Sequence, residues 1–195
     1  MKRFFDIISS FFGLVILSPI IILITLWIKH DSDGPIFFLQ QRVGLNGKLF
    51  NIFKFRTMVP DAEQKGLKVT VGSDPRITKS GHFLRKTKLD ELPQLLNVFL
   101  GQMSIVGPRP EVPEFMNEYP INIRNNILSI RPGITDLASI EFTNEAEILA
   151  GASDPKQKYI DDVMPIKADF YMDYVKNNNF IGDLKIILLT LKKIL

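Results

Sequence analysis

The longest apolar run of the chain lies near its start, from Phe11 to Ile28. An α-helix rises about 1.5 Å per residue, so this run is just long enough to cross a hydrocarbon core about 30 Å thick. No small-residue cleavage site follows it, which disfavours a removable signal peptide, and Trp27 and Lys29 at its end are typical of a membrane interface. The pattern therefore predicts a helix embedded in a membrane.

Two residues near the middle of this run, Ser18 and Pro19, affect the path of the helix. Proline removes a helical hydrogen bond and kinks the axis, and the serine hydroxyl can bond a freed carbonyl. Lys2 and Arg3 precede the run and Lys29 follows it, so the positive-inside rule gives no orientation. From the residues alone two paths stay open: a kinked helix that spans the bilayer, or a re-entrant helix with both basic ends on one side.

A β-hairpin is predicted after this helix. Residues 35–41 have the pattern of a short strand or of a segment along the membrane surface, and G-L-N-G at 44–47 predicts a turn. Residues 48–58 alternate imperfectly between apolar and polar, as a second strand does. Lys54 and Arg56 are two residues apart in this strand, so we expect them to project together, either as a solvated face or as part of a basic site.

Leucines in the stretch 85–110 recur at offsets of three and four, which predicts a short amphipathic helix with Gln94 and Asn97 on its polar face. Pro93 is tolerated only in the first helical turn, because amides there have no helical partner anyway. Gly101 is a natural C-terminal stop. These limits predict a helix of about ten residues.

Asp90 and Glu91 fall at the N-terminus of this predicted helix. Asp is a preferred N-cap that contributes about 1 kcal/mol, so capping alone would account for Asp90. Arg85 precedes the pair, Arg109 follows in G-P-R-P, and a helix N-terminus favours an ionised carboxylate. An ionised Asp among cations can attack phosphorus or hold a divalent metal. Arg131, in R-P-G-I-T, lies in a second turn suited to clamping phosphate oxygens.

The C-terminal third of the chain predicts helices without evident chemistry. Residues 141–162 are polar and acidic, and predict a helix around Ala146 followed by a loop through Gly151 and Pro155. Residues 167–176 predict another helix, which the three asparagines at 177–179 end. Residues 181–195 combine apolar residues with lysines, as in an amphipathic helix that either packs on the core or lies in the headgroup layer.

Composition adds an uneven charge distribution to this picture. The 195 residues carry a net charge of +3, but there are 14 Lys and Arg against 6 Asp and Glu through Lys88, and 10 against 15 beyond it. The basic part adjoins the apolar run, which fits a surface facing anionic headgroups and phosphorylated ligands. No recognition helix, zinc finger or aromatic RNA-binding motif is found, so we expect no nucleic-acid partner. The absence of Cys fits a reducing compartment.

Several motifs, taken together, closely resemble the bacterial sugar transferases. These are monotopic phosphoglycosyl transferases that start glycan assembly on a polyprenol phosphate, and the resemblance covers nearly the whole chain in the family's order. The motifs are K-R-F-F-D at 2–6, Q-Q-R-V-G at 40–44, F-K-F-R-T-M at 53–58, L-D-E-L-P-Q at 89–94, V-G-P-R-P at 106–110 and R-P-G-I-T at 131–135.

The resemblance implies an α+β, mainly helical fold in two parts. Residues 1–30 would form a re-entrant membrane helix hairpin, kinked at Ser18 and Pro19. Residues 31–195 would form one small cytosolic catalytic domain with a short β-hairpin and interfacial amphipathic helices. The protein would then be monotopic, on the cytosolic face of the bacterial inner membrane.

The resemblance also implies the reaction, in which a sugar-1-phosphate passes from a UDP-sugar to a polyprenol (undecaprenyl) phosphate and UMP is released. Asp90 would attack the β-phosphorus and form a covalent phosphosugar intermediate, and Glu91 would act as a base or metal ligand. Mg²⁺, held by Asp90 and Glu91, would neutralise the diphosphate. The residues expected to bind substrate phosphates are Lys54, Arg56, Arg85, Arg109 and Arg131.

The expected partners are membrane lipids and either a second copy of the chain or downstream glycosyltransferases of polysaccharide or lipopolysaccharide biosynthesis. The alternative function is a catalytically silent, membrane-anchored adaptor of a glycan-assembly complex, although an adaptor has no use for the pair Asp90 and Glu91. Residues 136–145 depart from the glycine and the A-Q-V-N-G-R-N-like run of many family members, so no sugar is assigned.

Overall fold

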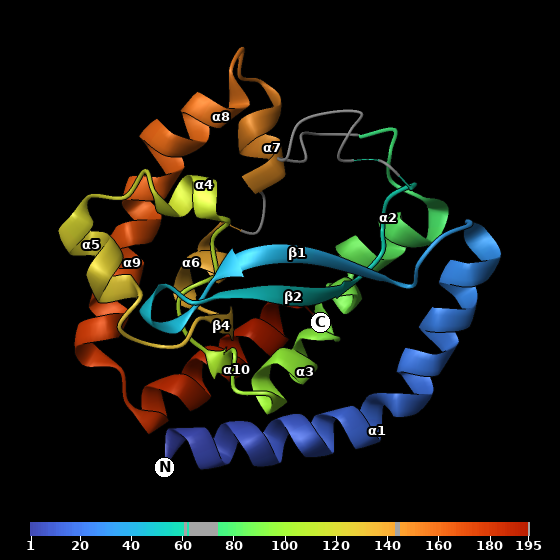
Figure 1. The fold of residues 1–195 in the computed structure, drawn as a ribbon, viewed down its shortest axis with the longest axis horizontal. Helices are drawn as coiled ribbons and strands as arrows, with labels where there is room; N and C mark the ends of the chain where they lie inside the picture. The colour runs from blue at the N-terminus through green and yellow to red at the C-terminus, as the bar shows by residue number, and fades with distance from the viewer. Residues whose placement is uncertain (61, 63–73, 143–144, 195) are drawn as a thin grey trace.

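The structure, a computed structural model, describes residues 1–60, 62, 74–142 and 145–194 (Figure 1). The described residues are mainly helical with two small two-stranded sheets, which agrees with the predicted class. In chain order the elements are α1 (Lys2–Asp31), β1 (Phe37–Val43), η1 (Leu45–Gly47), β2 (Leu49–Phe55), α2 (Lys79–Lys86), η2 (Leu89–Glu91), α3 (Gln94–Phe99), β3 (Ser104–Val106), α4 (Pro113–Met116), α5 (Ile121–Ile127), β4 (Gly133–Thr135), α6 (Leu137–Glu141), α7 (Glu145–Ala150), α8 (Pro155–Lys158), η3 (Tyr159–Val163), α9 (Met164–Asn177) and α10 (Phe180–Ile194).

Helix α1 contains the whole apolar run and is long and apolar enough to cross a membrane. It is continuous, yet Figure 1 shows that it changes direction partway along its length. Pro19 lies inside the helix, and the Oγ of Ser18 donates a hydrogen bond of 2.7 Å to the carbonyl of Val15. A proline interior to a helix is a recognised cause of such a bend.

Both ends of α1 are attached to the rest of the protein by buried or partly buried carboxylates. Near the start, Asp6 accepts hydrogen bonds from the Oγ of Ser104 at 3.0 and 2.9 Å, on strand β3. At the end, the Oδ2 of Asp31 accepts from the backbone N–H and the Oγ of Ser80, at 2.9 and 2.8 Å, in α2. The two ends of the apolar helix are therefore fixed to one body.

Strands β1 and β2 form the predicted antiparallel hairpin, with Phe38 opposite Lys54. The turn is η1, in which Asn46 adopts a left-handed conformation with φ 55°, a conformation that Asn tolerates better than most residues. On β2, Phe50 and Ile52 pack in a hydrophobic cluster with Val98 of α3. The hairpin thus lies over α3 and extends toward the segment that follows α2.

The predicted ten-residue helix is wrong in length, because it is divided into η2 and α3. Pro93 between them lacks an N–H, so regular α-helical hydrogen bonding begins only after it. The polar face of α3 also points inward: Asn97 is fully buried, donates to the carbonyl of Asn51 at 2.8 Å and accepts from the N–H of Phe53 at 2.9 Å. Its apolar side faces α1, with the rings of Phe99 and Phe11 6.3 Å apart.

Strands β3 and β4 form a parallel pair that the periodicity does not predict. Gly107 and Gly133 cross so closely that a Cβ on Gly133 would lie 2.1 Å from the backbone N of Gly107. Only glycine fits such an approach. The crossing brings the V-G-P-R-P and R-P-G-I-T segments side by side.

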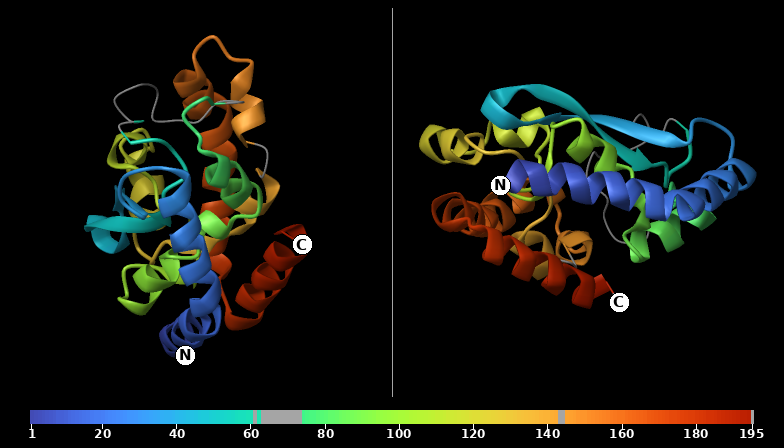
Figure 2. Two further views of the ribbon diagram at one scale, coloured as in Figure 1. Left: turned by 90° about the vertical axis from the view of Figure 1, so that its right-hand side faces the viewer. Right: turned by 90° about the horizontal axis from the view of Figure 1, so that it is seen from below.

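The C-terminal helices agree largely with the prediction. Helix α9 covers residues 167–176 and ends in the asparagine run, and α10 packs Ile186 against Val106 and Tyr174. The predicted loop is confirmed at residues 151–154, but its extension through Pro155 is wrong. Pro155 begins α8 behind an Asp154 cap that accepts from the N–H of Gln157 at 3.0 Å. Figure 2 shows α1 and α10 together on the side of the molecule seen from below.

Candidate active site

Asp90 and Glu91 lie in η2, a single 3₁₀ turn between α2 and α3. Lys88, immediately before this turn, adopts a left-handed conformation with φ 58°. The N-cap of α3 is Pro93, and no side chain caps that helix. The capping explanation of Asp90 is therefore wrong, and the carboxylate is available for another role.

Asp90 is 8% exposed, and its Oδ1 is fully buried without a hydrogen-bond partner in the described part of the chain. Burial raises the pKa of Asp90, and the positive charge of Lys54 only partly opposes that rise. The environment of Asp90 therefore disfavours the ionised form relative to an exposed aspartate. A buried, unpaired carboxylate oxygen is energetically costly, so it marks a position where a ligand can complete the site.

Glu91 has the opposite environment. Its Oε1 accepts hydrogen bonds from the Nζ of Lys54 at 2.7 Å and from the Nη2 of Arg109 at 2.8 Å. Burial alone would raise the pKa of Glu91, but the charges of Arg109 and Lys54 outweigh it and hold the pKa well below its usual range. Two adjacent carboxylates are thus distinguished by their surroundings: Glu91 stays ionised, and Asp90 keeps a free oxygen.

The two cations reach Glu91 from different parts of the fold. Lys54 is the penultimate residue of β2, and Arg109 follows β3 in the V-G-P-R-P segment. Burial lowers the pKa of Lys54, whereas the charge of Glu91 raises the pKa of Arg109. Arg109 is therefore the fixed positive charge of the site.

Arg85 belongs to the same neighbourhood. It lies in the last turn of α2, and its Nε donates to the Oγ1 of Thr57 at 2.9 Å. Its positive charge acts on Asp90 and opposes the rise of the Asp90 pKa. The structure thus brings together Asp90, Glu91, Lys54, Arg85 and Arg109 from the predicted set.

Arg56 and Arg131 have other contacts. Arg56 is buried, donates to the carbonyls of Ser32 and Asp33 at 2.7 Å each, and lies so close to Gly34 that a Cβ there would be 2.2 Å from its Nη1. It connects the end of β2 to the turn after α1. Arg131 donates from Nε to the carbonyl of Gly101 at 2.9 Å. The structure therefore does not bring these two arginines to the Asp90–Glu91 pair.

Two residues near the pair were missed in the sequence. Gln94 is 1% exposed, and its buried Nε2 has no partner among the described residues. Arg42 donates from Nη1 to the carbonyl of Pro110 at 2.9 Å, beside Arg109. Both lie inside motifs that carry the family resemblance, L-D-E-L-P-Q and Q-Q-R-V-G, so the motifs were a signal that could have identified them.

The sequence also provided no indication of a buried polar cluster near Arg109. The hydroxyl of Tyr159 donates to the Oε1 of Glu111 at 2.8 Å, and Lys167 pairs with Glu145. The negative charges of Glu145 and Asp136 contribute to the raised pKa of Arg109. The segment predicted to have no evident chemistry therefore contributes Glu145 and Tyr159 to the polar surroundings of Arg109 and Glu111. The members of this cluster are widely separated in sequence, which left no pattern to detect.

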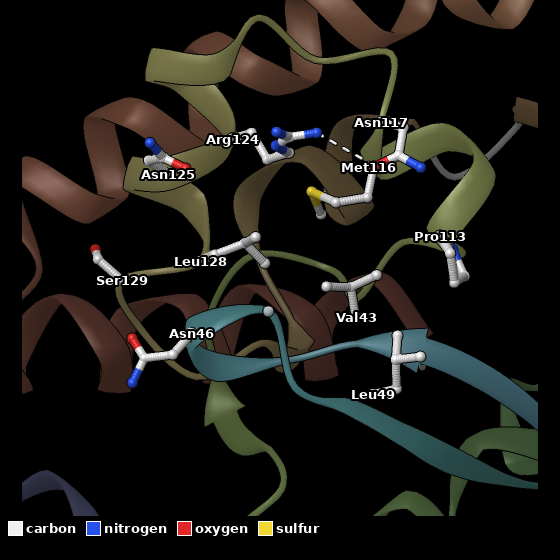
Figure 3. Close-up of a pocket in the computed structure, with 11 residues that line it drawn as sticks. Val43, Asn46, Leu49, Pro113, Met116, Asn117, Arg124, Asn125, Leu128 and Ser129 are labelled. Atoms are coloured by element: carbon white, nitrogen blue, oxygen red, sulfur yellow. Dashed lines mark hydrogen bonds between the residues drawn. The ribbon is translucent and has the colours of Figure 1, made fainter.

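One pocket of the described chain lies away from this site. It has a volume of about 640 Å³ and lies between the hairpin turn and helices α4 and α5 (Figure 3). Arg124 is its single lining cation, and the Nη1 of this arginine donates to the Oδ1 of Asn117 at 3.2 Å. None of the predicted site residues lines this pocket, so it gives no support to a catalytic role.

Comparison with known proteins places this geometry in context. The chain is 37% identical over 195 residues to a UDP-glucose:undecaprenyl-phosphate glucose-1-phosphate transferase of Escherichia coli, covering 99% of this chain and 40% of the relative. It is 37% identical over 199 residues to a UDP-N-acetylgalactosamine-undecaprenyl-phosphate N-acetylgalactosaminephosphotransferase of Aeromonas hydrophila, covering 100% of this chain and 44% of the relative. The chain thus spans less than half the length of these two relatives.

A third relative has nearly the same length. The exopolysaccharide production protein PSS of Rhizobium leguminosarum is 38% identical over 202 residues, which cover 96% of this chain and 91% of the relative. The family model described as bacterial sugar transferase matches residues 1–195. The motifs, the fold and these matches agree, and the chain belongs to the bacterial sugar transferase family.

Proposed function

We propose that this protein is a phosphoglycosyl transferase that moves a sugar-1-phosphate from a UDP-sugar to undecaprenyl phosphate and releases UMP. The observation that carries the proposal is the contrast within the carboxylate pair. Asp90 has a buried oxygen without a partner, and Glu91 is held between Lys54 and Arg109. The named reactions of the relatives from Escherichia coli and Aeromonas hydrophila support the same class of reaction.

In the first step, an Asp90 carboxylate oxygen attacks the β-phosphorus of the UDP-sugar. The bond from this phosphorus to the oxygen that bridges the two phosphates breaks, and its electron pair leaves with UMP. In the second step, a phosphate oxygen of the polyprenol phosphate attacks the phosphorus of the phosphosugar–aspartate, and the Asp90 carboxylate leaves. Arg109 and Arg85 supply the charge that stabilises the transferring phosphoryl group.

The donor atoms present fit Mg²⁺, which takes hard oxygen ligands from one or two carboxylates and from substrate phosphates. Asp90 offers its unpartnered Oδ1, and Glu91 would be the second carboxylate. No cluster of three or more His, Cys, Asp or Glu is found in the described ranges, so phosphate oxygens and water would complete the ligands. When bound, Mg²⁺ would neutralise charge on the diphosphate.

The test is to incubate the purified protein with undecaprenyl phosphate, Mg²⁺ and a panel of UDP-sugars, and to measure UMP release. We expect UMP from at least one sugar, in amounts that depend on the acceptor after the first turnover. UMP from no sugar would indicate the adaptor instead. A panel is needed because the relatives' names specify different sugars.

The pH dependence of this activity tests the environment of Asp90. Asp90 must be ionised to attack, so kcat/KM is expected to fall as the pH drops through its raised pKa. The charge of Lys54 lowers that pKa. In Lys54→Met the pKa of Asp90 therefore rises further, and the acid limb of the pH profile moves to higher pH.

A matched control for this variant is Lys48→Met, which removes an exposed lysine at the start of the second hairpin arm. Its acid limb is expected to coincide with that of the parent. An acid limb that stays in place in Lys54→Met would show that the limb does not report Asp90.

We also propose that α1 is re-entrant and that both its ends lie at the cytosolic face of the inner membrane. The attachment of Asp6 to Ser104 and of Asp31 to Ser80 supports this, because a helix with its ends on opposite sides could not keep both contacts. The exposed apolar residues that would enter or lie on the membrane include Phe12, Val15, Ile16, Ile22, Leu23 and Leu26 of α1, Ile181, Leu188 and Leu191 of α10, and Phe83, Phe99 and Leu100.

The absence of cysteine makes this topology directly testable. We expect a cysteine added before Met1 and a cysteine at Asp33→Cys to react only with a thiol reagent applied from the cytosolic side. A cysteine at Lys48→Cys, on the hairpin, provides the cytosolic reference. Labelling of the N-terminal cysteine from the periplasmic side would indicate a spanning helix.

A further inference from the structure

A second cationic site lies beside the first turns of α1. It is a pocket of about 280 Å³ whose lining includes Lys2, Arg3 and Arg131. None of its lining residues belongs to the Asp90–Glu91 pair or donates a hydrogen bond to it. The pocket therefore needs an explanation of its own.

Its two arginines are held by carbonyls and not by carboxylates. Arg3 donates from Nη1 to the carbonyl of Val98 at 2.6 Å and from Nη2 to that of Phe99 at 2.9 Å. Arg131 donates from Nε to the carbonyl of Gly101 at 2.9 Å. These carbonyls end α3, where a helix dipole favours positive charge. Capping accounts for three N–H groups, but it leaves the Nη1 and Nη2 groups of Arg131 without a partner among the described residues.

The carboxylates near the pocket are already engaged. Asp6 itself lines the pocket, but both of its oxygens already accept hydrogen bonds, from the Oγ of Ser104 and from the N–H of Ile105. Asp183 pairs with Lys2 at 2.5 Å. The charge of the two arginines is thus not cancelled by an ion pair in the described chain, which favours an anionic ligand.

The surroundings place this charge next to a lipid-facing surface. Phe4 of α1 is 71% exposed, and Ile181 at the start of α10 is 79% exposed. The rings of Phe5 and Phe180 lie 5.3 Å apart and join the two helices here. Basic side chains beside apolar groups that enter the membrane lie at the depth of anionic headgroups.

We propose that this pocket binds the phosphodiester headgroup of an anionic membrane phospholipid, with Arg131 and Arg3 donating to its phosphate oxygens. The planar guanidinium presents paired donors that match two phosphate oxygens. The bound lipid holds the N-terminal end of α1 against α3 and α10. The proposal rests on the membrane association of α1 and not on the proposed transfer reaction.

The test uses the full chain in detergent micelles and native mass spectrometry. Short-chain phosphatidylglycerol and phosphatidylcholine are titrated separately, and the fraction of protein with one bound lipid is measured. We expect a preference for phosphatidylglycerol. Arg131→Gln is expected to weaken its binding by about fivefold, the effect of one basic residue near an anionic surface, and to leave phosphatidylcholine binding unchanged.

A matched control is Arg124→Gln, which removes the same charge from the pocket of Figure 3. That pocket adjoins this one at Ser129, but Arg124 does not line the proposed lipid site, so lipid binding is expected to be unchanged. Arg3→Gln provides a second variant at the site, and Arg131→Lys is expected to recover part of the preference. Thermal unfolding checks that each variant is folded.

Three outcomes would overturn the proposal. Equal weakening by Arg131→Gln and Arg124→Gln would mean that only overall charge matters. Displacement of the phospholipid by millimolar inorganic phosphate would assign the pocket to free phosphate. One-for-one displacement by a short-chain polyprenol phosphate would assign it to the acceptor.

Discussion

Asp90→Asn is expected to lower UMP release by about 10³-fold or more while the protein remains folded, because an amide oxygen is too weak a nucleophile to form the phosphosugar intermediate. Folding raises the pKa of Asp90, so at neutral pH the folded state pays a penalty for the ionised carboxylate that the unfolded state does not. A neutral amide of the same shape removes that penalty. We therefore expect an unfolding temperature equal to or above that of the parent.

Intact-protein mass spectrometry measures the chemical step directly. Without acceptor, the parent protein is expected to gain the mass of one sugar phosphate on incubation with the UDP-sugar that it uses, and Asp90→Asn is expected to gain none. Asp162→Asn is the control, since this aspartate has a side chain 58% exposed and pairs with Lys158 on the surface. A mass gain in Asp90→Asn, or UMP release at the parent rate, would exclude Asp90 as the nucleophile.

The sequence predicted most of the residues that lie together in the candidate site, but it did not predict how they contact one another. Asp90 and Glu91 stand out because they are adjacent carboxylates among cations, and Lys54 and Arg109 lie in motifs of the family. Lys54 and Arg109 donate to the same oxygen of Glu91 because the hairpin and the V-G-P-R-P segment lie close together in the fold. This proximity is a tertiary contact. Helical periodicity carries no information about such contacts.

The fold shows the same division between local and long-range information. The hairpin follows from alternation and from the G-L-N-G turn, and α9 and α10 follow from their own periodicity. The inward orientation of the polar face of α3 does not follow from periodicity. Asn97 is buried by its hydrogen bonds to β2, and the apolar side of α3 is covered by α1. The usual assumption that apolar faces point to the core fails here because the neighbour is a long apolar helix whose own surface is largely exposed.

The pKa values of Glu91 and Asp90 are shifted in opposite directions, so the two carboxylates have opposite effects on folding stability. Asp90 is a cost of folding at neutral pH, since its pKa is raised, while Glu91 has a pKa held well below its usual range and contributes stability wherever it is ionised. That contribution is lost as the pH falls through the lowered pKa. Substitutions at the two neighbours should therefore have opposite effects on folding.

Glu91→Gln is expected to destabilise the protein, because it leaves the partly buried Lys54 and Arg109 without their shared carboxylate. Removing one partner of a fully buried ion pair costs about 3–5 kcal/mol, which in a chain of this size lowers the unfolding temperature by about 6–20 °C. The side chain of Arg109 is 31% exposed, so we expect a loss toward the lower end of this range. Glu114→Gln is the control, since its pair with Lys156 is on the surface, where such pairs contribute about 0–1 kcal/mol. Differential scanning fluorimetry of the detergent-solubilised proteins measures both.

The loss in Glu91→Gln should depend on pH, because Lys54 can give up its proton and Arg109 cannot. Burial already lowers the pKa of Lys54, and the charge of Glu91 is what opposes this. Without Glu91 the pKa of Lys54 falls further, so the destabilisation of Glu91→Gln eases as the pH rises through the lowered pKa of Lys54.

The double variant Glu91→Gln with Lys54→Met removes the charge of Lys54 at every pH. It should therefore recover stability at neutral pH without recovering UMP release. A double variant as unstable as Glu91→Gln alone would show that Arg109, and not Lys54, carries the uncompensated charge.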